Sequence, residues 1–337
     1  NIKQALMFFK EKNIRPINLM NKADLFFKKD SKYLYSKKNT FIKVNCPACN
    51  SRKKFFLFKK NKFSYYSCLN CKTYYLNPRP KEKTLHDFYK NSKLYEYWND
   101  YIFPSTEKVR NKKIFLPRVK KILEICKKFN VKKNRIIDIG AGYGTFCSII
   151  KRYKFFNEVV ALEPSLSGAK RCIEKKIKTL NIPIEAASYN DLKGTNVFTL
   201  FEVIEHIQNP YSFLKKIKKF TDKKSLVIFT CPNGMGFDIS FLGKKSEAID
   251  HEHLNYFNPQ SIYFLAKRAG YKVMEIITPG VLDVDILKNK YESKKFTNIN
   301  NFLLQVFDDE KKIKNLQNFL IRNKLSSNMW VVLKRND

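Results

Sequence analysis

Three glycines at alternate positions give the strongest chemical signal in the chain: Gly140, Gly142 and Gly144. They follow the apolar stretch 135–139 and precede a helix-compatible stretch, 145–153. This order predicts a strand, a tight turn and the start of a helix, with bare backbone that a ligand can approach closely. Glu163 ends the next apolar run, roughly 20 residues past the glycines, where an acid can hold the hydroxyls of a ribose. Together these residues predict a site for an adenosine-containing cofactor.

The spacing of the glycines distinguishes between cofactors. A dinucleotide loop follows the pattern G-x-G-x-x-G/A, so that a pyrophosphate can bind at the helix N-terminus. Here the third glycine comes one residue early, and Thr145 occupies the place of the last Gly or Ala. Asp138 lies two residues before the first glycine, where its charge would repel a pyrophosphate but attract a cation. S-adenosylmethionine carries an ammonium and a sulfonium, so we expect this cofactor; a nicotinamide or flavin nucleotide, or a turn that binds nothing, are the alternatives.

Two pairs of cysteines form the pattern C-x2-C-x18-C-x2-C: Cys46, Cys49, Cys68 and Cys71. This spacing is typical of a zinc ribbon, in which four thiolates close the tetrahedral shell of a structural Zn²⁺. The stretch 53–67 between the pairs is rich in Phe, Tyr and Lys and predicts a β-hairpin. Two disulfides, or a redox pair, are the alternatives. The other four cysteines lack ligand spacing, and we expect them to be buried: Cys126, Cys147, Cys172 and Cys231.

The histidines supply candidates for a general base. The stretch Asp250-His251-Glu252-His253 places carboxylates beside imidazoles, which can orient a ring and raise its basicity. The same stretch could instead be a hydrogen-bonded loop before a helix, and a metal held by His251 and His253 is a further alternative. His206, after a predicted strand, either shapes the loop there or acts directly. His86 is expected on the surface.

Four motifs in this order resemble those of class I S-adenosylmethionine-dependent methyltransferases, in the branch that includes ubiquinone-biosynthesis and sugar methyltransferases. The resemblance spans residues 135–334. After the glycine loop and Glu163 come the stretch 196–210, a strand at 225–231 with Pro232-Asn233-Gly234 behind it, and the stretch 250–259. A zinc ribbon followed by Asn77-Pro78-Arg79-Pro80 and such a domain also resembles a group of surface-polysaccharide and sugar-modifying methyltransferases.

The resemblance implies a set of cofactor-binding residues: Asp138, Gly140, Gly142, Gly144, Glu163, Pro164, Asp191, Phe201 and Glu202. The first four would line the methionine end of the cofactor, and Glu163 would bind the ribose hydroxyls. Pro164 and Ser165 would lie beside the adenine, and Asp191 would meet its amino group. The last two residues would close the pocket.

The segment 252–257, Glu-His-Leu-Asn-Tyr-Phe, resembles the E-H-L-x-Y-F segment of sugar C-methyltransferases, in which the histidine acts as a base. The resemblance therefore implies His253 as the base and Glu252 as its partner. Asp250 stands where those enzymes have a Tyr, which favours methylation of oxygen over methylation of carbon.

Alternating strands and helices must position these residues. Strands are predicted near 135–140, 158–163, 182–186, 196–202, 225–231 and 271–278, and a last strand at 329–334 can pair antiparallel with the one at 271–278. This pattern predicts an α/β fold with a Rossmann-like, seven-stranded sheet of the methyltransferase type, helices on both faces, and ligands at the carboxyl ends of the strands. A small zinc ribbon would precede it.

We expect five segments along the chain. Residues 1–43 form a partly helical extension, notably 2–12, and 44–80 the ribbon; 81–133 form a helical linker, whose aromatic stretch 95–101 either covers the cofactor as a lid or simply packs. Residues 134–280 form the cofactor-binding core. Residues 281–337 contain an insertion that could cover the acceptor pocket, a helix, and the final strand.

The formal charge of +36 raises the question of nucleic-acid binding. Lys greatly outnumbers Arg and is scattered through almost every segment, whereas specific nucleic-acid sites favour Arg. We therefore expect a solvated basic surface that attracts an anionic small molecule or glycan precursor, without a dedicated nucleic-acid site. No apolar run is long enough to span a membrane, so we expect a soluble, cytoplasmic protein.

Together these features predict a methyltransferase that acts on a sugar hydroxyl, or on a sugar carbon, in a nucleotide-activated or lipid-linked precursor of a surface glycan. One alternative is an RNA or protein methyltransferase whose ribbon recognises the polymer. Another is a non-catalytic binding module that has kept the fold.

Overall fold

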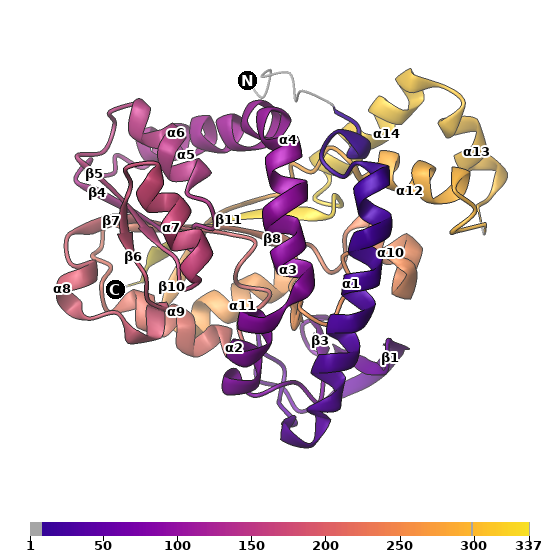
Figure 1. Ribbon diagram of the computed structural model, residues 1–337, viewed down its shortest axis with the longest axis horizontal. Coiled ribbons are helices and arrows are strands. Elements are labelled where there is room, and N and C mark those ends of the chain that lie inside the picture. Colours follow the sequence, from indigo (N-terminus) through magenta and orange to yellow (C-terminus); the bar gives the residue numbers. More distant parts are fainter. Residues whose placement is uncertain (1–8, 298, 337) are drawn as a thin grey trace.

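The computed structural model describes residues 9–297 and 299–336, in which seven strands form one mixed sheet of order β10-β11-β8-β7-β4-β5-β6 (Figure 1). The strands are β4 (Arg135–Ile139), β5 (Glu158–Leu162), β6 (Lys178–Leu180), β7 (Thr195–Phe201), β8 (Leu226–Pro232), β10 (Tyr271–Ile277) and β11 (Asn328–Arg335). Strand β4 pairs in parallel with β5 and β7, while β11 runs antiparallel to β8 and β10. The predicted α/β fold and its antiparallel last strand are confirmed.

The predicted position of one strand, 182–186, is wrong. The strand lies at Lys178–Leu180, and Ile184–Ala186 forms the 3₁₀-helix η5. Pro183 separates the two segments; it has no N–H to donate to a ladder and fixes its own φ near the observed −70°. Ile184 therefore packs in the hydrophobic core without joining the sheet.

Helices cover both faces of the sheet, as predicted. On one face lie α5 (Leu116–Lys128), α6 (Thr145–Arg152) and α7 (Leu166–Glu174). Their apolar side chains form a hydrophobic cluster with the strand side chains that point to this face, such as Ile136. On the other face, α9 (Pro210–Lys218) and α11 (Pro259–Ala269) share a cluster with Ile137. Neighbouring residues of β4 serve opposite faces because side chains alternate along a strand.

The cysteine region forms a second, antiparallel sheet of order β1-β2-β3-β9. Its strands are β1 (Lys54–Lys60), β2 (Phe63–Cys68), β3 (Tyr74–Leu76) and β9 (Asn255–Tyr256). The predicted hairpin at 53–67 is confirmed by the pairing of β1 with β2. Strand β9 comes from the segment between β8 and β10 and pairs with β3, so Tyr75 lies opposite Asn255, which is 180 residues further along the chain.

A nearly continuous helical run joins the two sheets: α2 (Glu82–Asn91), α3 (Lys93–Tyr97), the π-turn η3 (Trp98–Ile102), α4 (Phe103–Arg110) and the π-turn η4 (Asn111–Phe115). Helix α1 (Ile17–Ser36) lies beside α3 (Figure 1). The buried Asp30 of α1 accepts hydrogen bonds from Ser92 Oγ at 2.6 Å and Leu94 N at 2.9 Å. Residues 2–8 of the helix-like stretch 2–12 lie outside the described residues, and Glu11–Asn13 forms the 3₁₀-helix η1.

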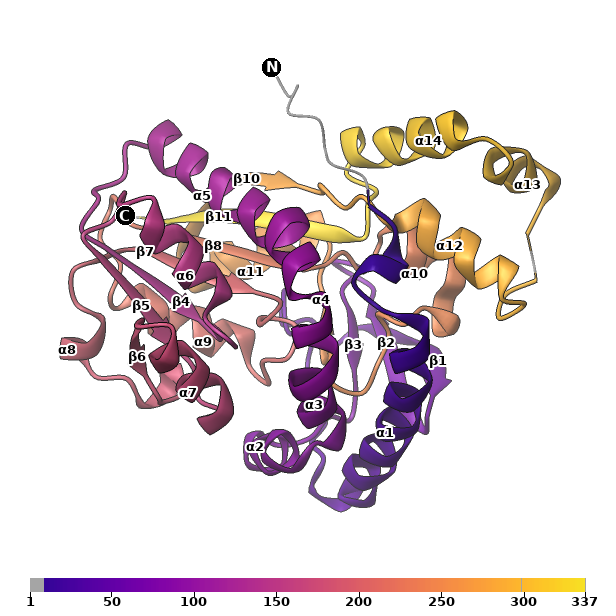
Figure 2. The same cartoon turned by 45° about the horizontal axis from the view of Figure 1, so that its top comes forward.

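Three helices near the C-terminus, α12 (Asp283–Glu292), α13 (Asn301–Phe307) and α14 (Glu310–Arg322), share a hydrophobic cluster with α10 (Phe237–Leu242). They lie at the end of the molecule opposite α7 and α8 (Tyr189–Leu192) in both views (Figures 1 and 2). The remaining elements are the 3₁₀-helices η2 (Lys38–Thr40) and η6 (Gly243–Lys245).

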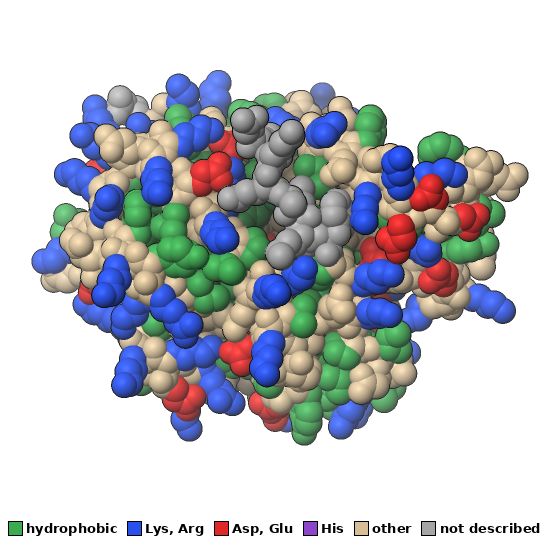
Figure 3. Space-filling model, turned by 90° about the horizontal axis from the view of Figure 1, so that it is seen from above, with side chains coloured by type: hydrophobic (Ala, Val, Ile, Leu, Met, Phe, Trp, Pro, Cys, Tyr) green, Lys and Arg blue, Asp and Glu red, His purple; other side chains and the backbone are tan. Residues whose placement is uncertain are grey.

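Lys and Arg side chains are spread over the face seen in Figure 3, with acidic side chains between them. They do not gather into one stripe on that face. Within the described residues, no helix combines the length and the apolar character needed to cross a membrane.

Candidate active site

The three glycines of the loop after β4 have positive φ values of 71°, 54° and 64°. A Cβ added to Gly140 would lie 2.7 Å from Val203 Cγ2, and one added to Gly144 would lie 2.8 Å from Cys172 Sγ. A Cβ added to Gly142 would meet no atom within 4 Å. Gly140 and Gly144 are therefore required for close packing, whereas Gly142 borders open space that a ligand can fill.

Glu163, at the end of β5, is 5% exposed and tied to the glycine loop. Its Oε2 accepts a hydrogen bond from Gly142 N at 2.7 Å, and its Oε1 accepts from Ser165 N at 2.9 Å and Ser165 Oγ at 2.7 Å. Burial raises the pKa of Glu163, although these hydrogen bonds oppose the shift. Asn181 was not expected here from the sequence; its Nδ2 donates to Glu163 O at 2.8 Å and to Pro164 O at 3.1 Å. Asn181 directly follows β6, so a correct prediction of where that strand ends would have placed it at the site.

Asp138 is the buried acid of β4. Thr199 Oγ1 donates to its Oδ1 at 2.7 Å. Burial raises the pKa of Asp138 to about 7, while the bond from Thr199 and the charge of Arg118 act in the opposite direction. Asp138 therefore holds its proton to a higher pH than an exposed aspartate does.

Arg118 of α5 is a site residue that the sequence analysis did not identify. Its Nη2 lies 3.8 Å from Glu202 Oε1, and its guanidinium carbon lies 4.8 Å from the centre of the Phe201 ring. Burial lowers the pKa of Arg118, and the charges of Glu202 and Asp138 raise it. It therefore brings a positive charge to a largely acidic site. Nothing in the sequence distinguishes it from the many other basic residues of the chain.

Glu202 follows β7 with a left-handed backbone, at φ 57°. Its Oε1 accepts hydrogen bonds from Thr230 Oγ1 at 2.5 Å and from Asn328 Nδ2 at 3.1 Å. The ring of Phe201, one residue earlier, lies 4.8 Å from that of Phe146 at the start of α6. The ends of three strands, β7, β8 and β11, thus meet beside the glycine loop.

Asp191 has a structural role in the present geometry. Its Oδ2 accepts hydrogen bonds from Ser188 N at 2.8 Å and Ser188 Oγ at 2.7 Å, which caps the exposed helix α8. Among the described hydrogen bonds, none joins Asp191 to the glycine loop or to Glu163. The adenine contact expected for Asp191 assumed a strand ending near residue 186, and the real strand β6 ends earlier.

Glu205, His206 and His253 come together next to this site, and we refer to them as the Glu205 cluster. One possible ligand atom from each lies within 4.8 Å of the others. The His206 and His253 rings are 4.6 Å apart. Glu205 is 0% exposed, and within the described residues neither of its carboxylate oxygens has a hydrogen-bond partner. Burial, and then the charge of Glu202, raise the pKa of Glu205 well above its usual value.

The Nδ1 atoms of both rings are held by the protein. His206 Nδ1 lies 2.9 Å from Tyr89 Oη and 3.2 Å from Glu252 O. His253 Nδ1 lies 2.9 Å from Ala248 O and 3.2 Å from Asp250 Oδ2. Burial, together with the neighbouring His253, lowers the pKa of His206 to about 3, so this ring is neutral.

The expected pairing of Glu252 with His253 is corrected by these contacts, because the carboxylate beside His253 is that of Asp250. Among the described contacts, none joins the Glu252 side chain to the His253 ring, whereas Asp250 Oδ2 lies 3.2 Å from His253 Nδ1. Asp250 Oδ1 also accepts hydrogen bonds from the backbone N of Glu252 at 2.8 Å and of His253 at 2.7 Å.

The other two histidines lie elsewhere. His251 is buried between aromatic rings, with centroids 4.8 Å from Phe27, 5.9 Å from Phe63 and 5.5 Å from Phe88. Burial lowers the pKa of His251 to about 4. His86 is exposed on α2, as expected.

The four ribbon cysteines fit a single tetrahedral metal ion. Their Sγ atoms lie within 4.8 Å of one another, and Cys46–Cys71 and Cys49–Cys68 are each separated by 3.4 Å. A ZnS₄ site with bonds of about 2.3 Å has sulfur atoms about 3.8 Å apart, and small movements produce it. A disulfide requires about 2.05 Å, so the two pairs are thiols here. The remaining cysteines are buried, as predicted: Cys126, Cys147, Cys172 and Cys231.

Arg79 joins the ribbon to the loop that carries His253. It is 0% exposed, and its guanidinium donates to Leu254 O at 3.0 Å, Asn255 Oδ1 at 2.9 Å and Gln208 O at 3.2 Å. The pairing of Tyr75 with Asn255 in strands β3 and β9 forms a second connection. The ribbon thus supports the loop directly.

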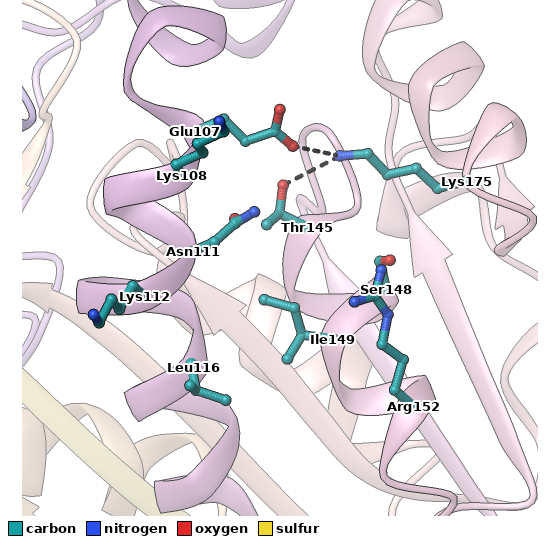
Figure 4. Close-up of a pocket in the computed structure, with 10 residues that line it drawn as sticks. All are labelled: Glu107, Lys108, Asn111, Lys112, Leu116, Thr145, Ser148, Ile149, Arg152 and Lys175. Carbon is teal, nitrogen blue, oxygen red and sulfur yellow. Dashed lines mark hydrogen bonds and ion pairs between the residues drawn. The ribbon is translucent and has the colours of Figure 1, made fainter.

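A crevice of about 540 Å³ lies elsewhere, between α4 and η4 on one side and α6 on the other (Figure 4). Lys175 crosses it, with Nζ 3.9 Å from Glu107 Oε1 and 3.3 Å from Thr145 Oγ1 (Figure 4). None of the cofactor residues expected from the sequence lines this crevice.

Comparison with known proteins connects this geometry to a family. Residues 109–276 match a family described as a methyltransferase domain. A curated relative, the carboxy-S-adenosyl-L-methionine synthase of Nautilia profundicola, is 22% identical over 181 residues, or 46% of this chain and 76% of the relative.

Two solved structures are also similar. An S-adenosylmethionine-dependent methyltransferase from Clostridium acetobutylicum has a TM-score of 0.46 and 9% identity, and covers 70% of this chain and 99% of its own. An O-methyltransferase from Brevibacillus brevis, in complex with S-adenosyl-L-homocysteine, has a TM-score of 0.45 and 16% identity, and covers 68% and 74%.

Proposed function

Since the chain contains a class I S-adenosylmethionine-dependent methyltransferase domain, we propose that it methylates a sugar hydroxyl in a nucleotide-activated or lipid-linked precursor of a surface glycan. The family match supports methyl transfer from S-adenosylmethionine. The Glu205 cluster, a group that can handle the proton of a hydroxyl, is the observation that carries the choice of acceptor chemistry.

In this proposal the cofactor binds along the carboxyl ends of β4, β5 and β7. The open space at Gly142 takes its methionine end, and Asp138 attracts the ammonium group. Arg118 provides the positive charge that the methionine carboxylate requires. Glu163, already fixed by Gly142 and Ser165, accepts the ribose hydroxyls through its remaining lone pairs.

Methyl transfer needs the acceptor oxygen in line with the methyl group and the sulfur. Holding the reacting atoms in that geometry can supply roughly 7–11 kcal/mol of the barrier reduction. A carbon–oxygen bond forms as the carbon–sulfur bond breaks, S-adenosylhomocysteine leaves, and the hydroxyl proton must be removed. Removal of that proton at the Glu205 cluster would contribute roughly 10²- to 10⁴-fold.

Two further features support an anionic sugar derivative as the acceptor. The net charge of +36 favours the approach of a diphosphate or of a negatively charged lipid headgroup. The segment 252–257 resembles the E-H-L-x-Y-F segment of sugar C-methyltransferases. The basic side chains are spread over the surface in Figure 3. This arrangement fits a general attraction of anions better than a continuous binding surface for a nucleic acid.

The test is transfer of radioactive methyl from S-adenosylmethionine to a panel of nucleotide diphosphate sugars, with total RNA and a protein extract as competing acceptors. We expect label in the sugar fraction, and loss of label with the Glu163→Lys variant. Label confined to RNA or to protein would refute the sugar acceptor and leave the methyltransferase assignment intact.

A further inference from the structure

The Glu205 cluster has the composition and spacing of a metal site that is separate from the ribbon. Two imidazoles and a carboxylate form a common ligand set for divalent transition metals. Two ligands opposite each other on one ion, at about 2.1 Å, are about 4.2 Å apart, close to the 4.8 Å that bounds this cluster. We propose that Glu205, His206 and His253 bind a divalent ion of the Mn²⁺, Fe²⁺, Co²⁺ or Zn²⁺ class.

The hydrogen bonds of the two rings support this proposal. A histidine that binds metal through one nitrogen usually donates its other N–H to a carbonyl or a carboxylate, which fixes the tautomer. His206 Nδ1 lies 3.2 Å from Glu252 O and 2.9 Å from Tyr89 Oη, whose oxygen can also accept a hydrogen bond, and His253 Nδ1 lies 2.9 Å from Ala248 O. With the proton on Nδ1, each ring keeps a lone pair on Nε2, which has no described hydrogen-bond partner. Those lone pairs are then free to bind a cation.

Glu205 provides independent support. Its carboxylate is fully buried, and within the described residues it receives no hydrogen bond. Ionising a buried carboxyl group that has no partner is costly, and a bound cation would offset that cost. The geometry is also pre-set, because Glu205 O accepts hydrogen bonds from Leu254 N at 2.9 Å and Asn255 N at 3.1 Å. These bonds fix the backbone of Glu205 against the residues that follow His253.

The two metal sites would differ in selectivity. The ribbon presents four sulfur ligands, which favour Zn²⁺, while the Glu205 cluster presents nitrogen and oxygen, which also accept harder ions such as Mn²⁺. Mn²⁺ can therefore probe the cluster while zinc fills the ribbon.

The role of this ion rests on the proposed function. Three protein ligands leave coordination positions open, and an acceptor hydroxyl bound there would lose its proton to solvent water more readily. The resulting oxygen attacks the methyl carbon as the carbon–sulfur bond breaks. In this arrangement His253 is a metal ligand that positions the acceptor, and it does not act as a free base.

The experiment uses the full chain with zinc in the ribbon, dialysed against a weak chelator. Mn²⁺ is then added and its binding is measured by calorimetry and by electron paramagnetic resonance. We expect one Mn²⁺ per chain beyond the zinc. Glu205→Gln and His253→Ala should each weaken Mn²⁺ binding by roughly tenfold or more, whereas His86→Ala, at an exposed histidine, should leave it unchanged.

Circular dichroism checks the fold of each variant, and Glu205→Gln retains the shape of the side chain if His253→Ala is unstable. Absence of Mn²⁺, Co²⁺ and a second Zn²⁺ from the wild-type chain would overturn the proposal, as would equal Mn²⁺ affinity in Glu205→Gln. S-adenosylmethionine affinity is measured on the same samples. If the chain binds S-adenosylmethionine but no Mn²⁺, only the metal site is refuted. If it binds Mn²⁺ but no S-adenosylmethionine, only the proposed function is refuted.

Discussion

Gly142 and Gly144 share a left-handed backbone but have different surroundings. A side chain at Gly144 would strike the buried Cys172, whereas a side chain at Gly142 would enter open space. The two positions therefore separate the cost of folding from the cost of cofactor binding. Asp138 lies two residues before Gly140. Burial raises its pKa in the protein without cofactor, so its contribution to stability should depend on pH.

We predict that Gly142→Ala weakens S-adenosylmethionine binding by roughly tenfold or more, since its methyl group occupies space assigned to the cofactor, and that it costs about 1–2 kcal/mol of stability for the left-handed φ. Gly144→Ala is the matched control and should cost about 2–4 kcal/mol through overpacking as well as strain. Calorimetry and urea unfolding measure the two quantities. Equal stability loss in both variants would contradict the packing difference.

For Asp138 we predict a pH-dependent loss of stability. Its folded pKa of about 7 lies above the unfolded value, so the folded state binds more protons between these two pKa values. Stability attributable to this residue therefore falls as pH rises from about 4 to about 7. Between pH 5 and pH 8, unfolding of wild type relative to Asp138→Asn should lose roughly 2–3 kcal/mol. A parallel pH dependence in the two proteins would show that Asp138 ionises normally.

At the scale of elements, strand β9 links the ribbon to the site. It pairs with β3, its residue Asn255 contacts Arg79, and Asn258 donates to Cys71 O at 3.0 Å. Arg268 of α11 also contacts the turn between Cys46 and Cys49, where it donates a hydrogen bond to Ala48 O at 2.5 Å. The ribbon is therefore part of the support of the His253 loop, and its disturbance should be felt at the active site.

Arg79→Lys keeps the charge but removes the guanidinium group that donates to Gln208 O, Asn255 Oδ1 and Leu254 O. We expect a loss of roughly 2–4 kcal/mol, because buried carbonyls are left without donors. Turnover should fall more than S-adenosylmethionine affinity, since the loop at 252–255 moves while the glycine loop does not. Urea unfolding and steady-state kinetics check this, with Arg52→Lys, at an exposed ribbon residue, as the control. An unchanged stability would show that the Arg79 contacts contribute little.

Zinc binding by the ribbon is a second prediction at this scale. Metal analysis of the chain purified with a weak chelator should give about one tightly held zinc. Cys49→Ser should lose that zinc and lower the unfolding temperature, while Cys126→Ser, at a buried cysteine of α5, should keep it. Zinc retained by Cys49→Ser, or absent from the wild-type chain under reducing conditions, would overturn the ribbon assignment.

For the whole molecule, the basic charge is large but dispersed. Figure 3 shows Lys and Arg side chains distributed across the surface that it displays. Some exposed basic side chains of the chain pair with acids, such as Lys93 Nζ with Glu96 Oε2 at 2.8 Å. A dispersed charge attracts polyanions without selecting a sequence, because selection needs side chains aligned with base edges.

We therefore predict that two RNA oligonucleotides of equal length and unrelated sequence bind with similar, weak affinity. Raising the salt from about 50 to about 200 mM should reduce both affinities by roughly 100-fold or more. Fluorescence anisotropy measures both binding curves. Tight binding of one RNA that persists at high salt would instead reveal a dedicated nucleic-acid site.

The sequence by itself determined the features that depend on a few neighbouring residues. The glycine spacing, the acid at the end of β5, the paired cysteines and the alternation of strands and helices are local patterns, because backbone sterics, side-chain periodicity and ligand geometry act over short stretches. The prediction of a strand near 182–186 was wrong for a local reason as well, since Pro183 has no N–H to donate to a neighbouring strand.

Only the tertiary structure decided which distant residues meet. Arg118 reaching Glu202, Asp250 rather than Glu252 facing His253, and β9 completing the ribbon sheet all depend on packing between elements far apart in the chain. The burial of Glu205 without a partner is of the same kind, because solvent exclusion arises from the whole fold. A side chain's ionisation and ligand-binding power follow from that environment, which no local pattern contains.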